Sequence, residues 1–474
     1  MGIKTSEVMT YFQQLQKAKQ WVAQHKSNLI VSLKKSFVTL GDLASLAQYV
    51  ENDSAVYWRD PACGQEQFAF GVAHSVESNS YDPIRDLQHA WHDCSQHVFA
   101  DDLSDVRFFL GFSFDPRLSI SEKLWAGWPH GWLLLPRYRA VRDASGACTM
   151  YAYYYLGEDD AEQFDIDQAL ADFDQITAAW VTKSRMDSLP VSYVAQEIPN
   201  DMGRAAWKKK VEDAVSTIVH GDLAKVVLAR HATVETKAHF AISETLQTLR
   251  EQFPESAVFG VFRDGAVFAG ASPERLVHVQ DHGVAVDCLA GTTRRSPVPD
   301  EDATLAYELL RSQKNRHEHQ MVIDGVRQAL NGVVSSIQIA DEPTIKKLSN
   351  VQHLYTPVKG LLAPGYDAFS LVKRLHPTPA VAGLPKQAAL FYLADHEELA
   401  RGWYAAPIGF VDAAGNLDCY VGLRSALIQG NRAELFAGAG ITADSDPELE
   451  YVETMWKMNP MREALHVVSV REGL

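Results

Sequence analysis

The sequence predicts an α/β protein of the α+β type, in which large and mostly antiparallel sheets are flanked by helices. Two observations indicate this class. Apolar runs occur in pairs joined by short turns, as in VFGVF–RDG–AVFAG at 258–270, and this is the pattern of a β-hairpin. Longer stretches with apolar residues at helical spacing lie between the pairs. Successive hairpins build antiparallel sheet, because parallel neighbours need a long crossover connection.

The first region of the chain, residues 1–195, is rich in aromatic side chains. Segments such as VYWRD at 56–60 and YAYYYL at 151–156 predict strands, because aromatic and β-branched residues favour a pleated, half-buried surface. We expect these strands to be short and to be separated by Gly, Pro and Asp turns. Helices are expected near 5–25 and 160–183.

An internal boundary is predicted at 188–201, where SLPVSYVAQEIPND separates two different compositions. The aromatic-rich pattern ends before this segment, and regular helix and hairpin patterns begin after it. We therefore divide the chain into an N-terminal region, 1–195, and a second region, 200–474, that belong to the same fold.

The second region begins with a helix, a strand and another helix. Asn200 or Asp201 can cap the first helix, whose apolar residues recur every third or fourth position until the helix stops at Gly221. The strand is expected at 224–235 and the next helix near 242–253. Three further hairpins follow, at 275–291, 409–423 and 425–439.

Two later helices are predicted between and after these hairpins. The segment from Glu308 to Ala329 has apolar residues at helical spacing. The segment 443–458 has start signals, with Ser445 or Asp446 as the cap and Pro447 in the first turn.

Composition and charge exclude several classes of function. The formal net charge of −16 disfavours nucleic acid as a partner. The five cysteines are scattered, which argues against a disulfide framework and favours a reducing compartment. The longest apolar runs are far too short to span a membrane, and the N-terminal stretch lacks the apolar core of a signal peptide. We therefore expect a cytoplasmic protein that binds neither membrane nor nucleic acid.

The segment GAGITA at 438–443 satisfies the dinucleotide-binding pattern G-x-G-x-x-A. Too few residues follow Ala443 to build a helix, a second strand and the rest of a nucleotide-binding half-sheet. A Rossmann fold is therefore excluded, although a tight turn at this point could bring the backbone close to a ligand anion.

The triplet His317-Glu318-His319 suggests a zinc site. Residues two apart on a helix point about 200° apart, so the two imidazoles cannot grip one ion together. Zinc binding through this pair is therefore disfavoured, and Glu318 has to be considered separately as a solvated helix carboxylate or as a ligand of another metal.

A second group of carboxylates lies on the helix predicted at 443–458. Glu450 and Glu453 are three residues apart and Lys457 is four beyond Glu453, so all three share one face. A Glu–Lys pair on a helix surface is one explanation. The other is that Glu450 and Glu453 join Glu318 as oxygen ligands of a hard divalent ion, for which Mg²⁺ is favoured over zinc.

A series of long motifs runs in order from 222 to 457. They read DLAKVVLAR, GASPERLV, LAGTTRR, SQKNRHEH, NVQHLYT, LHPTPAVAGLPK, RGWYAAPIGFVD, GLRSALI and GAGITADSDPELEYVETMWK. With these motifs the second region resembles the chorismate-utilising enzymes, and within them the isochorismate synthases. The first 200 residues match more loosely, through VYWRDP and WLLLPR, and resemble the menaquinone-type members. The resemblance implies one large α/β body with antiparallel sheets, flanking helices and a deep active-site cleft.

The resemblance also implies a reaction and its acid and base. Water adds at C2 of chorismate while the C4 hydroxyl leaves, which gives isochorismate and makes the protein an isomerase. By motif match, Lys225 is the base for the water and Glu274 is the acid for the departing oxygen. A lysine with a pKa of about 10.4 is protonated at pH 7, so burial or a neighbouring cation must lower it. The pKa of Glu274 must instead be raised.

The remaining site residues also follow from the resemblance. Glu318 and Glu453 would hold Mg²⁺, with Glu450 beside or behind them, and the metal would receive the ring carboxylate of chorismate. The implied substrate-binding residues are Gly291, Thr292, His376, Ala380, Tyr404, Arg424, Gly438 and Lys457.

These substrate-binding residues divide by role. Arg424 and the backbone near Gly438 would take the enolpyruvyl carboxylate, because a guanidinium suits a bidentate pair with a carboxylate. The N–H groups of Gly291 and Thr292, together with Lys457, would hold the ring carboxylate. His376 would contact the ring region, Tyr404 would line the cleft, and Ala380 lies where the branches of the family differ.

Two positions separate the branches of this family. Lys225 is the first, because the ammonia-using anthranilate and aminodeoxychorismate synthases are expected to carry a neutral amide there. Salicylate synthases share the lysine but tend to have a threonine near Ala380. The sequence therefore favours isochorismate as the released product.

Several alternatives stay open at this point. The protein could be a salicylate synthase, or an isochorismate synthase of a siderophore pathway rather than of menaquinone biosynthesis, towards which the aromatic N-terminal strands point. A non-catalytic, metal-dependent anion-binding protein on the same fold is a different class, and a zinc hydrolase is the weakest reading. No self-complementary patch is evident, so we expect a monomer.

Overall fold

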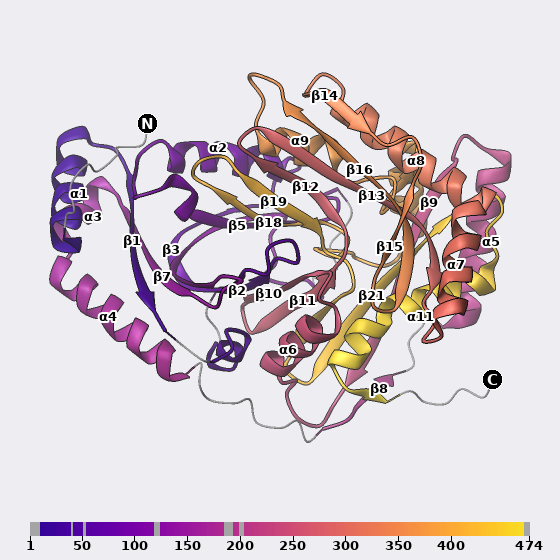
Figure 1. The fold of residues 1–474 in the computed structure, drawn as a ribbon, viewed down its shortest axis with the longest axis horizontal. Coiled ribbons are helices and arrows are strands. Elements are labelled where there is room, and N and C mark those ends of the chain that lie inside the picture. Colours follow the sequence, from indigo (N-terminus) through magenta and orange to yellow (C-terminus); the bar gives the residue numbers. More distant parts are fainter. Residues whose placement is uncertain are drawn as a thin grey trace.

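The computed structural model describes residues 10–38, 41–50, 54–117, 124–183, 193–198 and 203–468. Within these ranges, 22 strands hydrogen-bond into a single sheet. Only two strand pairs in this part of the chain are parallel, and helices cover the outside of the sheet (Figure 1). The predicted α+β class, with mostly antiparallel sheet and flanking helices, is confirmed.

The sheet is organised around β6 (Gly131–Arg142). One edge of β6 pairs along its length with β3 (Glu66–Ser78). The other edge is shared, because residues 131–134 pair with β5 (Arg107–Phe112) and residues 138–142 pair with β7 (Cys148–Leu156). Sheet therefore extends from β6 in two directions, which we call the first limb, beginning at β3, and the second limb, beginning at β5.

The first limb continues from β3 by antiparallel pairing. In spatial order its strands are β2 (Ala55–Arg59), β10 (Ala257–Arg263), β11 (Ala266–Ser272), β20 (Ser425–Gln429), β21 (Arg432–Ile441), β9 (Lys225–Glu235) and β8 (Ala195–Ile198). Two short strands end it, because β17 (Gly383–Leu384) pairs with β9 and β22 (Val467–Val468) pairs with β8.

The second limb continues from β5. In spatial order its strands are β18 (Pro407–Asp412), β19 (Leu417–Val421), β12 (Arg275–Gln280), β13 (Gly283–Arg294) and β16 (Val351–Leu362), after which β14 (Val334–Ile339) and β15 (Thr344–Lys347) both pair with β16. A side branch leaves β7 and consists of β1 (Leu29–Phe37) and β4 (Val98–Phe99).

Two short connections join the far parts of the two limbs. Pro273 and Glu274 link β11 of the first limb to β12 of the second, and residues 422–424 link β19 of the second limb to β20 of the first. The sheet must therefore curl until the limbs face each other, and residues in these two connections lie where they meet.

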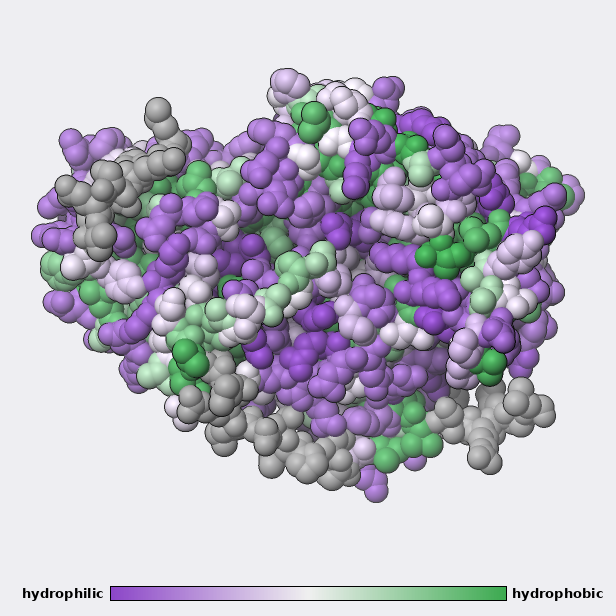
Figure 2. All heavy atoms as spheres, viewed as in Figure 1, coloured by the Kyte–Doolittle hydropathy of each residue, from purple (hydrophilic) through white to green (hydrophobic). Residues whose placement is uncertain are grey.

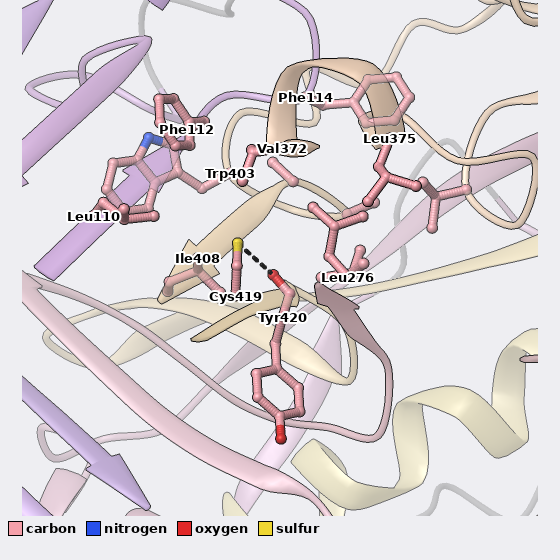
Figure 3. Packing of buried hydrophobic residues seen from close by; sticks show 14 of the residues in the cluster. Leu110, Phe112, Phe114, Leu276, Val372, Leu375, Trp403, Ile408, Cys419 and Tyr420 are labelled. Atoms are coloured by element: carbon pink, nitrogen blue, oxygen red, sulfur yellow. Dashed lines mark hydrogen bonds between the residues drawn. The ribbon is translucent and has the colours of Figure 1, made fainter. Parts of the chain in front are cut away.

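A hydrophobic core fills the space between the limbs. It includes Trp58 of β2 and Phe259 of β10 from the first limb and Ile408 of β18 from the second. Figure 3 shows Ile408 beside Cys419 of β19, and Leu375 of α9 (Ala368–Leu375) elsewhere in the same cluster. Both limbs thus bury one face in a common core.

Helices cover the outer faces (Figure 1). A second hydrophobic cluster lies beneath α1 (Tyr11–His25), α4 (Ile166–Lys183), α6 (Ile242–Gln252) and α11 (Pro447–Ala464). The remaining helical segments are η1 (Ala44–Tyr49), α2 (Pro83–Ser95), η2 (Leu103–Asp105), α3 (Glu158–Gln163), α5 (Arg204–His220), α7 (Pro299–Arg311), α8 (Gln313–Leu330) and α10 (Lys386–His396).

Strands from the two regions of the chain alternate within the sheet. β2 of the N-terminal region lies between its neighbour β3 and β10 of the second region, and β5 pairs with β18. Backbone hydrogen bonds therefore join residues 1–195 to residues 200–474 in both limbs.

The predicted hairpins are confirmed as β10–β11, β12–β13, β18–β19 and β20–β21. The predicted strand at 224–235 and helix at 242–253 are also present, as β9 and α6. GAGITA begins inside β21, so Gly438 lies in a strand and not in the tight turn that we had considered.

Other predictions need correction. The helix expected from Glu308 to Ala329 is two helices, α7 and α8, because the Ser312 side chain accepts a hydrogen bond from the Asn315 N–H and caps a new helix. The helix expected at 160–183 is divided into α3 and α4. β3 and β6 have 13 and 12 residues, so the N-terminal strands are not all short. The caps expected at Asn200 and Asp201 lie outside the described residues.

The start of α11 agrees with its sequence signals. Asp446 is the cap and accepts hydrogen bonds from the N–H groups of Glu448 and Leu449, and Pro447 is the first helical residue. The helix continues beyond the predicted end to Ala464, so Glu450, Glu453 and Lys457 lie in its first three turns.

The face shown in Figure 2 is mainly hydrophilic, and its apolar side chains form small, separated patches. Among the described residues, none of the helices combines the length and apolar character that crossing a bilayer requires.

Candidate active site

A cavity lies where the two limbs meet. β9 and β21 contribute to it from the first limb, β13 and β16 from the second, and the two short connections between the limbs complete its wall. Every site residue predicted from the sequence lines this cavity except His376 and Glu450. The curl of the sheet therefore gathers residues that lie up to 232 positions apart, from Lys225 to Lys457.

Lys225 is the first residue of β9 and is only 1% exposed. Its Nζ lies 2.9 Å from Oε1 of Glu318 on α8, so strand and helix are joined across the cavity by an ion pair. Gly440 of the neighbouring strand leaves room for this pair, because a Cβ there would lie 2.8 Å from Lys225 Cε and 2.9 Å from Glu318 Oε1.

Glu274 lies in the connection between β11 and β12 and is buried. Burial raises the pKa of its carboxyl to about 7, although Arg424, Lys225 and Lys457 oppose the shift. The carboxyl therefore holds a proton through mildly acidic pH and can donate it near neutral pH.

Arg424 lies in the connection between β19 and β20, with a φ of 50°, and it is buried. Its guanidinium has neither a hydrogen-bond nor an ion-pair partner among the described residues, although Tyr404, Glu453 and Glu274 are close enough to affect its pKa. A buried cation without a partner is costly. Its position in the cavity wall therefore indicates an anionic ligand, for which a guanidinium is a bidentate donor.

Tyr404 lies beside this arginine in the cavity wall. Its ring stacks on Phe436, with centroids 5.2 Å apart, and burial raises the pKa of its hydroxyl to about 12. The hydroxyl is therefore protonated at neutral pH and can donate a hydrogen bond. A Cβ on Gly438 would come within 3.2 Å of this oxygen, so glycine keeps the space between strand and ring open.

Backbone groups of β13 face the cavity at a β-bulge. The register with β16 shifts between Ala290 and Thr292, and Gly291 has a φ of 74°, which is the left-handed region that glycine enters without strain. The bulge removes Gly291 from the ladder with β16 at the wall of the cavity.

Lys457 of α11 provides a further cation. Its Nζ lies 2.7 Å from Glu453 Oε1 and donates a hydrogen bond of 2.8 Å to the Gly438 carbonyl. The lysine therefore bridges α11 and β21 at the wall of the cavity.

Three carboxylates lie on the helix side of the cavity. Burial alone would raise the pKa of Glu318, but Lys225, Lys457 and Lys314 together hold it below its ordinary value. Glu450 lies behind the wall, where its Oε1 accepts a hydrogen bond of 2.7 Å from Ser445 Oγ. Burial and the nearby Glu453 raise the pKa of Glu450 to about 7.

The donor set fits a hard divalent cation, because it consists of carboxylate oxygens without thiolates. In the described residues, however, no three His, Cys, Asp or Glu side chains are gathered as a metal site. Glu318 and Glu453 are paired with Lys225 and Lys457 instead. These two glutamates face one cavity, and they would hold an ion by turning from the lysines towards it.

Comparison with known proteins agrees with this site. The family profile described as "Chorismate binding enzyme" matches residues 13–466. The chain belongs to the chorismate-binding enzyme family. The resemblance inferred from the motifs is thereby confirmed, and the isochorismate synthases among its relatives support an isomerase-type enzyme.

Individual relatives support the same assignment. A salicylate biosynthesis isochorismate synthase of Pseudomonas aeruginosa is 36% identical over 416 residues, which cover 87% of this chain and 85% of that protein. The isochorismate synthase MenF of Bacillus subtilis is 36% identical over 360 residues, covering 75% and 74%. The solved structure of the menaquinone-specific isochorismate synthase MenF of Escherichia coli aligns with a TM-score of 0.76 at 26% identity, covering 95% of this chain and 100% of that one.

His376 lies away from the candidate active-site cavity. Its Nε2 is 2.8 Å from the carbonyl oxygen of Phe114, burial lowers its pKa to about 3, and it lines a separate hollow with Lys386. Ala380 and Val381 of the same loop do line the cavity. His376 therefore shapes the loop from behind, and a direct contact with the substrate ring is not supported by its position.

The two histidines beside Glu318 point in different directions. His317 is exposed, whereas His319 is 1% exposed and its Nε2 lies 2.9 Å from Thr356 Oγ1. The helical geometry that argued against a shared zinc ion is therefore observed on α8.

Two titratable residues that line the cavity were not singled out from the sequence. His353 of β16 lines the cavity, and its Nδ1 lies 3.0 Å from Thr292 Oγ1. Burial lowers its pKa well below the usual value, so the ring is neutral. The motif NVQHLYT contains this residue, but nothing in its spacing distinguishes it from a core histidine.

Arg401 is the other missed residue. It is 3% exposed and forms an ion pair with Glu397. It also donates hydrogen bonds of 2.8 Å and 2.7 Å to the carbonyl oxygens of Val381 and Val227. Arg401 thus fastens the Ala380 loop to β9, the strand that begins with Lys225.

Proposed function

We propose that this protein is a Mg²⁺-dependent isochorismate synthase. Its substrate is chorismate, to which it adds water at C2 while the C4 hydroxyl leaves and the ring double bonds shift. The observation that carries the proposal is the presence of Lys225, Glu274 and the unpartnered Arg424 in one buried cavity. A protein that only binds an anion needs the arginine but has no use for a matched base and acid.

The cations of the cavity would hold the two carboxylates of chorismate. Arg424 would receive the enolpyruvyl carboxylate, with Tyr404 as a neutral hydrogen-bond donor beside it. Lys457 and the peptide groups at Gly291 and Thr292 would hold the ring carboxylate. Both ends of the substrate would then be fixed, which places the ring between base and acid.

Two side chains would carry out the two proton transfers of the reaction. Lys225 would take a proton from the water that adds to C2, which requires that its ammonium group first give up a proton. Glu274 would give its proton to the C4 oxygen, which leaves as water, and the two side chains regain their starting states through solvent. The reaction is an isomerisation, because one water is consumed and one is released.

Glu318 and Glu453 would hold the Mg²⁺ ion, and Glu450 would support them from behind. When bound, the ion supplies positive charge that neutralises and orients the ring carboxylate. Glu450 does not line the cavity, and its Oε1 accepts a hydrogen bond from the Ser445 hydroxyl.

The second part of the proposal is the pathway that uses the product. We assign the product to menaquinone biosynthesis, on the alignment of the chain with the menaquinone-specific enzyme over 95% of its length. The relative from Pseudomonas aeruginosa is named for salicylate biosynthesis, so a siderophore-type or salicylate role is the alternative. Salicylate synthases tend to have a threonine near Ala380, so the alanine favours release of isochorismate.

The test is product analysis with purified protein, chorismate and Mg²⁺, with and without EDTA. Isochorismate should be the main enzymatic product, and EDTA, Lys225→Gln and Glu274→Gln should each abolish it. Lys359→Gln is a matched control, because Lys359 is exposed on β16, and it should leave the activity unchanged. Salicylate and pyruvate as main products would move the protein to the lyase branch. Substrate binding without turnover would support the anion-binding alternative.

A further inference from the structure

A second cavity, of about 670 Å³, lies at the beginning of α6. It is lined by Ala266 and Val267 at the start of β11 and by Ile428 at the end of β20. The opposite ends of these two strands lead to Glu274 and Arg424, so the cavity is separate from the candidate active site. Its size is in the range of about 300–1,000 Å³ that is typical of small-molecule sites.

Apolar groups form about half of the wall. Ala47 and Val50 contribute from η1 and the residue after it, Phe262 from β10, and Val267 and Ile428 from the sheet. No aspartate or glutamate is among the described residues that line the cavity. A ligand with an apolar body fits such a wall, whereas nothing in the wall would hold a cation.

One end of the cavity carries unsatisfied hydrogen-bond donors. The cap of α6, Ala241, has no side chain that can accept from the first turn. Among the described residues, the backbone N–H groups of Ile242, Ser243 and Glu244 have no partner. They are the donors that a helix N-terminus leaves free, and the helix dipole adds partial positive charge there.

Ser243 provides a second and independent indication of a ligand. It is 4% exposed and lines the cavity, but its hydroxyl has no hydrogen-bond partner among the described residues. The hydroxyl oxygen is accessible from the cavity, so a ligand atom there can form a hydrogen bond with it.

The charged groups nearby leave this end available to an anion. Arg263 in the wall is engaged by Glu77, at 2.6 Å. Glu244 directs its carboxylate to His466, at 3.2 Å, and does not line the cavity. His239 also lines the cavity and offers a further ring N–H.

We propose that this cavity is a second ligand site, which binds a small organic monocarboxylate with an apolar body. The carboxylate accepts hydrogen bonds from the first turn of α6 and from the Ser243 hydroxyl, and the apolar body packs against Phe262, Val267 and Ile428. The proposal does not depend on the reaction assigned to the active site.

Isothermal titration calorimetry with 3-phenylpropionate tests the site, with the uncharged 3-phenylpropanamide as the matched ligand. Ser243→Asp places a carboxylate in the cavity and suits the first turn of a helix, so the variant should fold. Ala205→Asp is the matched control, because Ala205 is exposed at the same second helical position of α5, whose cap also lacks a side-chain hydrogen bond. Ser243→Ala removes only the hydroxyl, and circular dichroism verifies the fold of each variant.

We expect 3-phenylpropionate to bind the wild type and the Ala205→Asp variant equally and to bind Ser243→Asp at least about tenfold more weakly. Ser243→Ala should show a smaller loss, and the amide should bind the wild type at least about tenfold more weakly than the acid. Arg424→Ala should leave the affinity unchanged, because it alters only the other cavity.

Three results would overturn the proposal. They are no binding to the wild type up to about 10 mM, equal binding of acid and amide, and binding that Arg424→Ala abolishes while Ser243→Asp leaves it intact. Chorismate turnover, measured on the same samples, reports on the active site separately.

Discussion

The ammonium group of Lys225 and the carboxylate of Glu318 form an ion pair of 2.9 Å between the first residue of β9 and the second turn of α8. The lysine is 1% exposed and has this carboxylate as its ion-pair partner. Glu318 is also influenced by Lys457 and Lys314. The proposed base and the proposed metal ligand are therefore direct neighbours. Replacing one or the other should change the free energy of unfolding by different amounts.

Glu318→Gln should lower the free energy of unfolding by about 3 kcal/mol, because it leaves the Lys225 ammonium buried without a carboxylate. Lys225→Met should cost only about 1 kcal/mol, because Glu318 keeps two other lysines nearby. Urea unfolding of metal-free protein measures both values. A larger loss in Lys225→Met than in Glu318→Gln would contradict the argument.

The raised pKa of Glu274, about 7, predicts the pH dependence of the reaction. The protonated acid is lost as pH rises through this value, so kcat/KM for conversion of chorismate should fall above about pH 7. Glu274→Gln should abolish the activity at every pH, and should not merely move the pH at which the activity falls. A wild-type profile that stays flat to about pH 9 would show that Glu274 is not the acid.

The same shift has a consequence for stability. The folded-state pKa of Glu274 is raised above the ordinary 4.5, so its contribution is fully present below pH 4.5 and is lost as pH rises through about 7. The stability of Glu274→Gln relative to the wild type should therefore increase between these values, by on the order of 3 kcal/mol. Urea midpoints measured at pH 4.5 and pH 8 test this, and an unchanged difference would contradict it.

Gly440→Ala should disturb the Lys225–Glu318 pair without unfolding the protein. The new Cβ would lie within 3.0 Å of both side chains, so the pair must separate or shift. We expect activity to fall at least about tenfold, since small displacements of catalytic groups have large effects. Gly157→Ala is the control, because its Cβ would approach only surface polar atoms at 3.3 Å. Equal activity in both variants would show that the pair tolerates displacement.

Arg401→Lys should reduce both stability and activity. Lysine retains the charge but cannot pair with Glu397 and also reach the carbonyl oxygens of Val381 and Val227. We expect a loss of about 3 kcal/mol and a raised KM, because the Ala380 loop loses its attachment to β9. Thermal unfolding and steady-state kinetics measure the two effects, and a variant altered in neither would show that the loop is held by its own contacts.

Much of the fold could be predicted from local patterns. Each hairpin of the second region has a short turn between apolar runs, so β10–β11 and β20–β21 could be located from residues close in sequence. The pairing of β2 with β10 and of β5 with β18 could not, because strands far apart in the chain carry no mark that identifies their partners. The break at Ser312 was also missed, because the apolar spacing continues across it.

Some residues of the candidate site could be predicted from the sequence, and others were misplaced or missed. Long motifs placed Lys225, Glu274 and Arg424, and the structure brings them together in one cavity. His376 belongs to such a motif too, yet its ring turns to the Phe114 carbonyl, since a motif places a residue in a loop but does not orient its side chain. Arg401 was missed because the partners that reveal its role, Val227 and Val381, are distant in sequence.

The interleaving of strands in the curled sheet has a practical consequence. If residues 200–474 were expressed alone, β10 would lose β2 and β18 would lose β5, which would leave two apolar strands with unpaired backbone edges. Such edges recruit further strands, so the fragment should aggregate rather than behave as an autonomous module. Shortening the protein for biophysical work should therefore begin at chain ends or surface loops and not at the change in composition near residue 195.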